Sequence, residues 1–297
     1  MTPKEELKSS NATLSSKTSV VVVRHGERLD YVMRDAGQNW IPTSQRPWDP
    51  PLTERGIQQA KALGDALPKI LEGINVPPIA AVYSSPFLRC QQTAIGLAGT
   101  KVKVKVELGL SESMNENWYR SWAIPGTDGT WGYKKQEIPL SQLDVSTLHP
   151  SATKSLDEIL DWKQANLDDA FASLMDQEHV SKSSIGRSYS LHPPHFESFK
   201  MQRERMKDTL ELLSTDHPDE TFVLVSHGGP VTHLYESLTG NNWDVHGESK
   251  YCCYSIYQRP EGESTWKPLV VNQVLGTDES QSPPKEEEST PKTFTWA

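Results

Sequence analysis

The sequence predicts an α/β fold in which a mostly parallel sheet carries helices on both faces, with a helical and loop insertion acting as a cap. Between residues 19 and 276, short β-branched runs alternate with helical patterns, as in sheets whose strands are buried on both faces. Polar, chemistry-bearing residues follow directly after several of these runs. The pattern changes between residues 113 and 195, where aromatic residues crowd into a stretch interrupted by glycine and proline.

Runs rich in valine and isoleucine predict the strands, and one run with strictly alternating lysine and valine predicts a strand with one wet face. The expected strands are Ser19–Val23, Ile79–Tyr83, Lys101–Val106, Thr221–Val225, Tyr251–Tyr257 and Leu269–Val274.

Apolar residues at helical spacing predict the helices. The first begins near Thr53, and Pro68 should kink it or end it early. Ser85 and Pro86 are typical of an N-cap and a first helical residue, and so should open the next helix. A capping box at Ser155 and Glu158 opens another. The three later helices are expected at Phe87–Gly96, Leu156–Leu174 and Glu197–Leu213.

The expected organisation is a single domain over residues 19–276, containing the 113–195 insertion, between a disordered arm (1–18) and a disordered acidic tail (277–297). The net charge of −9 disfavours a surface built to bind nucleic acid or anionic lipid. The sequence starts without a signal peptide and has no apolar run of membrane-spanning length. We therefore expect a cytoplasmic protein with no nucleic-acid partner and no membrane partner, whose three cysteines are reduced.

Charged residues follow the predicted strands at the edge where ligands bind in parallel sheets. Arg24, His25 and Arg28 follow the first strand, Arg89 lies one turn into the helix after the second, and His227 follows the Thr221 strand. Three guanidinium groups and two imidazoles at one edge would suit a phosphate group, because each guanidinium stays charged and offers paired donors. Taken singly, each motif is also explained by a surface ion pair or a hydrogen-bonded histidine.

These clusters resemble the histidine phosphatase superfamily, whose fold is called phosphoglycerate mutase-like. The segments that carry the resemblance are VVVRHGERLD, PLTERG, YSSPFLRCQQTA, VELGLSE and VLVSHGGPV. The continuation after Arg-His-Gly, together with SPFLRCQQTA, is most similar to the branch containing ecdysteroid phosphatase and the suppressor-of-T-cell-receptor-signalling phosphatases. The resemblance implies a histidine acid-type phosphatase, a phosphoric monoester hydrolase, in preference to a mutase.

The resemblance also implies roles for the site residues. His25 would attack phosphorus and form a phosphohistidine, while His227 and the arginines Arg24, Arg28 and Arg89 would hold the phosphoryl oxygens. Glu112 would be the proton donor, with Glu107 and Glu116 close by in the sequence as alternatives. No cofactor and no metal are implied. The partner would be a phosphorylated small molecule or phosphopeptide, such as an aryl phosphate or phosphotyrosine, and a homodimer is compatible with the family.

Two other functions are left open by the sequence. One is a phosphoglycerate-type mutase, and the other is a weakly active family member that serves as a binding or scaffold protein. The insertion's aromatic residues also have two interpretations, because they could form its small core or wall a lid over the leaving group. These residues are Trp118, Tyr119, Trp122, Trp131 and Tyr133. His192 and His195, on a proline loop, are expected to face solvent and not to bind a metal.

Overall fold

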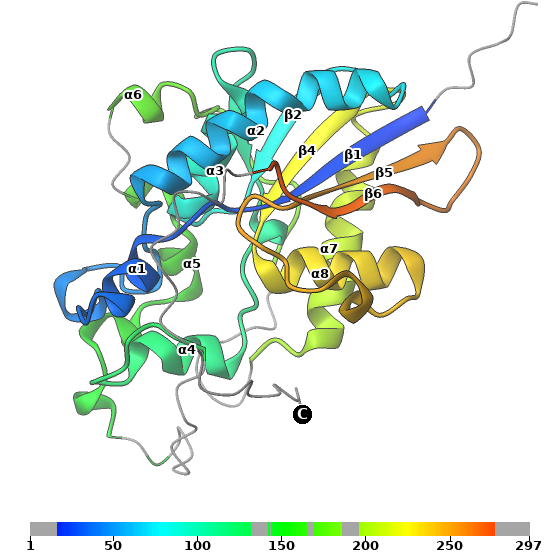
Figure 1. Ribbon diagram of the computed structural model, residues 1–297. Coiled ribbons are helices and arrows are strands. Elements are labelled where there is room, and N and C mark those ends of the chain that lie inside the picture. The colour runs from blue at the N-terminus through cyan, green and yellow to red at the C-terminus, as the bar shows by residue number, and fades with distance from the viewer. Residues whose placement is uncertain (1–16, 132–141, 143, 166–168, 186–195, 277–297) are drawn as a thin grey trace, which may run out of the picture.

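A six-stranded sheet forms the centre of the computed structural model, which describes residues 17–131, 142, 144–165, 169–185 and 196–276 (Figure 1). The strand order is β3-β2-β4-β1-β5-β6. The strands β3, β2, β4 and β1 pair with one another in parallel. β5 is antiparallel to β1, and β6 is antiparallel to β5. The strands are β1 Lys17–Arg24, β2 Ile79–Ser84, β3 Val104–Val106, β4 Thr221–Ser226, β5 Tyr254–Pro260 and β6 Lys267–Gln273. The predicted fold class is confirmed, although β3 is only half as long as expected.

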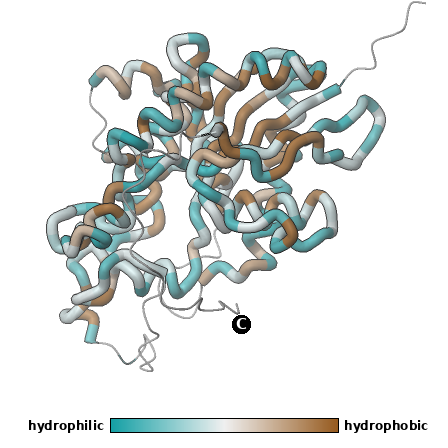
Figure 2. The backbone as a smooth tube through the Cα atoms, in the orientation of Figure 1, coloured by the Kyte–Doolittle hydropathy of each residue, from teal (hydrophilic) through white to brown (hydrophobic). Residues whose placement is uncertain are grey.

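Helices cover both faces because alternate residues of β1 are apolar in both directions. Val21 and Val23 pack in a core cluster with α2 and α3, while Val20 and Val22 pack in a second cluster with α7 and α8. Figure 2 shows the hydrophobic colour concentrated along the central strands. Each strand side chain points to the opposite face from its neighbour, so a continuous valine run needs a helical layer on each side. The four covering helices are α2 Glu54–Gly73, α3 Leu88–Ala98, α7 Phe199–Ser214 and α8 Gly228–Thr239.

Helix α2 continues through Pro68 and ends five residues later, so the expectation of an early end is wrong. Pro68 lies on the exposed face, while Leu67 and Leu71 are fully buried. Proline inside a helix costs about 3 kcal/mol, and burying each leucine contributes about 1.5–3 kcal/mol. Burial of the helix's apolar stripe therefore outweighs the lost backbone hydrogen bond.

The helix expected at Leu156–Leu174 is divided in the structure. The capping box is present, but α5 spans only Leu156–Leu160. The next residue, Asp161, caps a separate 3₁₀ turn, and a second helix, α6, covers Asp169–Ala172. The residues after α6 pair with the edge strand, because the Val104 N–H donates to the Leu174 carbonyl oxygen and the Val104 carbonyl oxygen accepts from Asp176. An unpaired sheet edge is a site for unwanted pairing, and here this segment of the insertion covers it.

Two short helices gather with α5 beyond the carboxyl ends of the parallel strands (Figure 1). These are α1 Leu29–Asp35 and α4 Glu116–Ala123. The expected arm and tail fall largely on residues 1–16 and 277–297, outside the described residues, and Lys17 and Thr18 belong to β1. Within the described ranges, every helix is too short or too polar to cross a membrane.

A glycine at the start of α2 fits against the loop that follows β1. A Cβ atom on Gly56 would lie 2.3 Å from the carbonyl oxygen of Glu27, whereas a Cβ atom on Gly73, in the same helix, would meet open space. We expect Gly56→Ala to lower the free energy of unfolding by about 1–3 kcal/mol because the backbone must move. Gly73→Ala should raise it by up to about 1 kcal/mol. Urea unfolding of both variants tests this, and equal stability of the two would contradict the packing argument.

Candidate active site

Two histidines meet where the two central strands end. β1 and β4 are parallel neighbours whose last pair is Arg24 and Ser226, so the residues that follow lie at the same edge of the sheet. The His25 N–H donates to the Ser226 carbonyl oxygen at 2.9 Å, and the rings of His25 and His227 have centroids 5.4 Å apart. The pairing of the strands thus brings together side chains that are about 200 residues apart in the chain.

His25 is only 1% exposed and is held in one neutral form. Its Nδ1 lies 2.7 Å from the Gly26 carbonyl oxygen, which can only accept, so Nδ1 carries the proton and Nε2 keeps its lone pair. Burial, followed by the charges of Arg89, Arg24 and Arg28, lowers the pKa of His25 well below its usual value of 6.5. At neutral pH, Nε2 is therefore available as a nucleophile.

Arg89, Glu112 and His227 form a buried cluster beside His25. Oε2 of Glu112 lies 3.3 Å from Nη2 of Arg89 and 3.3 Å from Nδ1 of His227. Burial, followed by the charges of Arg89 and His25, lowers the pKa of His227 well below 6.5. The permanent cation of Arg89 and the neutral imidazole of His227 therefore converge on one carboxyl oxygen of Glu112.

Two of the three predicted arginines, Arg24 and Arg89, keep donors that a ligand could use, whereas Arg28 is paired. Nε of Arg24 and Nε of Arg89 are buried and have no hydrogen-bond partner among the residues that the structure describes. Leaving a buried donor unpaired costs about 1–3 kcal/mol, which a phosphate oxygen would recover. Arg28 forms a two-point ion pair with Asp30, at 2.6 and 2.5 Å. Burial alone would lower the pKa of Arg28, but Asp30 reverses this and leaves it above its usual value.

Of the three glutamates considered from the sequence, Glu112 is the one that faces the cluster. The carboxylate of Glu107 is fully buried and accepts from the N–H of Ser183 at 2.9 Å and from its hydroxyl at 2.6 Å. It fastens the returning end of the insertion to the end of β3. Glu116 lies in the first turn of α4, where it pairs with Arg120 at 2.6 Å and its side chain is 49% exposed.

The backbone that carries Glu112 is held by a residue that sequence reasoning missed. Arg205, in α7, donates to the carbonyl oxygens of Gly109, Ser111 and Glu112 at 2.7 to 3.1 Å. Its guanidinium also pairs with the buried carboxylate of Glu197 at 2.7 Å. The sequence contained a signal that could have identified Arg205. It lies directly beside the apolar stripe of the predicted helix, where a charge needs buried partners.

Two further residues lie beside Arg89 and His227. From the sequence, Ser85 was expected to be an N-cap, and Asp49 was assigned no role. Ser85 is not an N-cap, because its hydroxyl lies 2.8 Å from Nε2 of His227 and the helix begins only at Leu88. Asp49 accepts a hydrogen bond from the Leu88 N–H at 2.7 Å. The start of α3, and with it Arg89, is therefore positioned by a carboxylate from a distant loop.

The insertion's aromatic residues form a core that borders the site. Trp118, Tyr119 and Trp122 are buried in one cluster with Phe87, and Trp131 packs against that cluster. The Phe87 ring also lies edge-on to His227, with centroids 5.3 Å apart. The burial of Trp118 and Trp122 in this cluster supports the core interpretation for these two tryptophans. Tyr133, like His192 and His195, lies outside the described residues.

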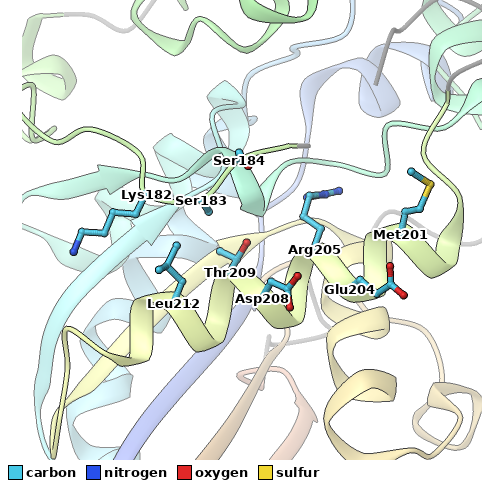
Figure 3. A pocket seen from close by; sticks show the side chains of 9 residues that line it. All are labelled: Lys182, Ser183, Ser184, Met201, Glu204, Arg205, Asp208, Thr209 and Leu212. Atoms are coloured by element: carbon cyan, nitrogen blue, oxygen red, sulfur yellow. The ribbon is translucent and has the colours of Figure 1, made fainter. Parts of the chain in front are cut away.

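A separate cavity of about 340 Å³ lies between α7 and residues 182–184 (Figure 3). Arg205 lines this cavity and holds the Glu112 backbone on its other side. The lining is polar, with residues Lys182, Ser183, Ser184, Met201, Glu204, Arg205, Asp208, Thr209 and Leu212. In the described part of the chain, no group of three or more His, Cys, Asp or Glu side chains is arranged to hold a metal ion.

Comparison with known proteins identifies a family and several relatives. A family model described as the histidine phosphatase superfamily (branch 1) matches residues 20–124 and 150–272, which is most of the chain. The unmatched residues between these segments fall inside the 113–195 insertion. Among solved structures, the ecdysone phosphate phosphatase of Bombyx mori, in complex with tungstate, superposes with a TM-score of 0.50 at 18% identity. The superposition covers 93% of this chain and 98% of that one, which shows a shared fold.

Three relatives match part of the sequence. Human ubiquitin-associated and SH3 domain-containing protein A is 35% identical over 134 residues, 36% of this chain and 19% of that protein. The ecdysteroid-phosphate phosphatase of Bombyx mori is 32% identical over 150 residues, 41% and 21% respectively. The transcription factor tau 55 kDa subunit of Saccharomyces cerevisiae is 34% identical over 145 residues, 45% and 29% respectively. The matches span less than a third of each relative's length.

Because His25 and His227 are buried in the neutral form, we expect the protein to lose stability as the pH falls below about 6.5. In that range the unfolded chain protonates these imidazoles, while the folded chain does so only at its own lower pKa values. Each histidine should lower the free energy of unfolding by about 1.4 kcal/mol per pH unit in this window. Urea unfolding between about pH 7 and about pH 5 measures the slope. It should be shallower in His227→Asn, and an unchanged slope in that variant would contradict the argument.

Proposed function

The chain belongs to the histidine phosphatase superfamily (branch 1), and from this premise we propose that it is a metal-independent phosphomonoesterase that works through a phosphohistidine on His25. The observation that carries the proposal is the convergence of a neutral, buried imidazole with a free Nε2, two arginine Nε donors that have no partner among the described residues, and one carboxyl group. Each part of a two-step phosphoryl transfer has a residue in reach.

In the first step, Nε2 of His25 attacks phosphorus in line with the leaving oxygen. The N–P bond forms as the P–O bond to the leaving group breaks, and Glu112 gives its proton to the departing oxygen. Arg24, Arg28 and Arg89 stay charged throughout and bind the three remaining oxygens. In phosphoryl transfer, such electrostatic stabilisation and positioning supply most of the rate.

In the second step, water attacks the phosphohistidine. Glu112, now a carboxylate, takes a proton from the water as the new P–O bond forms and the N–P bond breaks. His25 returns to the neutral form that its surroundings favour, because burial and then the nearby arginine charges disfavour the imidazolium. Inorganic phosphate then leaves, and Glu112 is protonated again.

The substrate is proposed to be a phosphorylated small molecule or a phosphopeptide, with an aryl phosphate or phosphotyrosine as the first class to test. One relative, from Bombyx mori, is named as a phosphatase of ecdysteroid phosphates. A phosphoglycerate-type mutase remains the alternative within the enzyme class, and product analysis separates them. A phosphatase releases inorganic phosphate, whereas a mutase moves the phosphoryl group to another position on the same carbon skeleton.

A second candidate function, a binding subunit, is favoured by one observation. The chain is 34% identical over 145 residues to the yeast transcription factor tau 55 kDa subunit, whose name describes a component of an assembly. The Nε donors of Arg24 and Arg89 have no partner in the part of the chain that the structure describes, and a purely structural role would leave them without a use. The enzymatic proposal is therefore the stronger one.

Phosphate release from para-nitrophenyl phosphate in the presence of EDTA tests the proposal. We expect turnover by the wild type and a loss of at least about a thousand-fold in His25→Ala, because the nucleophile is removed. His217→Ala is the matched control, since the imidazole of His217 bonds Glu220 at 2.8 Å just before the start of β4, at the opposite end of that strand from His227. An inactive wild type, or equal rates in His25→Ala and the wild type, would remove the basis for a phosphohistidine mechanism.

The role of Glu112 predicts a dependence on the leaving group. Glu112→Gln should lower kcat/KM by about a hundred-fold or more for an alkyl phosphate, whose leaving oxygen needs a proton. The loss should be much smaller for para-nitrophenyl phosphate, whose leaving group departs as a stable anion. Glu116→Gln serves as the control on an exposed neighbour. A loss in Glu112→Gln that is the same for both substrates would show that Glu112 only supports its neighbours.

A further inference from the structure

The segment 249–253, just before β5, is attached to the end of β1 by three hydrogen bonds. The N–H of Arg24 donates to the Cys253 carbonyl oxygen at 3.0 Å, and the N–H of Cys252 donates to the His25 carbonyl oxygen at 3.2 Å. Nη1 of Arg24 donates to the Ser249 carbonyl oxygen. The segment therefore fixes both the backbone and a side chain of the Arg-His pair. Its residues 251–253, expected as the first residues of a strand, precede β5, which begins only at Tyr254.

Tyr251, in the middle of this segment, lies against the same two residues. The Cζ atom of Arg24 lies 4.6 Å from the centre of the Tyr251 ring, and the His25 ring has its centroid 5.8 Å away. The next residue, Cys252, has φ of +52°, in the left-handed region that non-glycine residues rarely adopt. Such strain costs of order 1–3 kcal/mol, so the contacts of the segment must offset it.

The two arginines of the Arg-His-Gly-Glu-Arg motif are held in different ways. Arg28 lies over the Tyr31 ring at 4.2 Å and also pairs with the Asp30 carboxylate. In the described residues, Arg24 has an aromatic ring and a backbone carbonyl oxygen as its partners but no carboxylate within 4.0 Å. A ring binds one face of a guanidinium and leaves its net charge uncompensated. Arg24 is thus fixed in place while its charge remains available to an anion.

We propose that Tyr251 is a positioning residue for phosphoryl binding, whose ring holds the Arg24 guanidinium beside Nε2 of His25 without neutralising it. The inference deepens the proposed function and rests on it for the identity of the bound group. The ring, and not the hydroxyl, carries the effect, because the contact is between the ring face and the cation. Loss of the ring would let Arg24 leave its position, and the site would bind phosphoryl oxygens less tightly.

Binding of orthovanadate, a phosphate analogue, tests this without requiring turnover. We expect Tyr251→Leu to weaken vanadate binding by about ten-fold, the size of a partly buried cation–π contact. Tyr251→Phe should stay within about three-fold of the wild type, because it keeps the ring. In an Arg24→Ala background, Tyr251→Leu should change vanadate binding by less than about two-fold, since the partner cation is gone. Isothermal titration measures all five proteins: the wild type, the two Tyr251 variants, Arg24→Ala, and Arg24→Ala combined with Tyr251→Leu.

Tyr254→Leu is the matched control, because Tyr254 lies three residues further on and packs in the core, on β5 opposite Val23. It should bind vanadate like the wild type. The inference fails if Tyr251→Leu binds normally, if Tyr251→Phe loses as much as Tyr251→Leu, or if the loss persists in the Arg24→Ala background. Should Tyr251→Leu not fold, Tyr251→Gln and Tyr251→Trp make the same comparison of a lost ring with a kept one. Vanadate binding by a wild type that shows no turnover would reject the proposed function but leave this test valid.

Discussion

The parallel pairing of β1 with β4 is the constraint on which the rest of the structure depends. It brings His25 and His227 to one edge of the sheet, because the strands that carry them end in register at Arg24 and Ser226. The same pairing requires valine side chains on both faces of β1, and therefore two helical layers. One of those layers supplies Arg89 from the first turn of α3, and the other supplies Arg205, which holds the Glu112 backbone from α7. The core and the site are thus consequences of a single strand pairing.

Concentrated positive charge is the main electrostatic property of the site. Arg24, Arg28 and Arg89 surround two imidazoles that burial already disfavours in the charged form, so both histidines have lowered pKa values. Each arginine is positioned by a different device: Arg24 by a ring and a backbone carbonyl, Arg28 by a carboxylate and a ring, and Arg89 by the capped start of its helix. An anion that binds there would recover the cost of the unpaired donors. The fixed positions of the three arginines, together with the binding of an anion, explain how their positive charges can be kept near one sheet edge in a protein whose net charge is −9.

The insertion is part of the site's support. Its aromatic core shares Phe87 with the residues around His227, and its returning end is fastened to β3 through Glu107. The Glu112 segment follows directly after Glu107, so the insertion, α7 and β3 together determine where this carboxyl group lies. A change in the insertion can therefore alter the site without touching a substrate.

The sequence by itself determined the fold class, the order of the strands along the chain and the polar residues that follow them, because valine runs and strand-end motifs depend on local patterns. It also identified the family, from motifs such as Arg-His-Gly-Glu-Arg, and the family model confirmed that family. It could not determine that Ser85 bonds His227, that Pro68 lies within a continuing helix, or that the helix expected over 156–174 is divided. Nor could it show that Arg205 and Asp49 hold the backbone around Glu112 and Arg89, or that Tyr251 packs on Arg24. These depend on contacts between residues far apart in the chain, and only the tertiary structure decided them, since local preferences of about 1 kcal/mol yield to burial and buried hydrogen bonds.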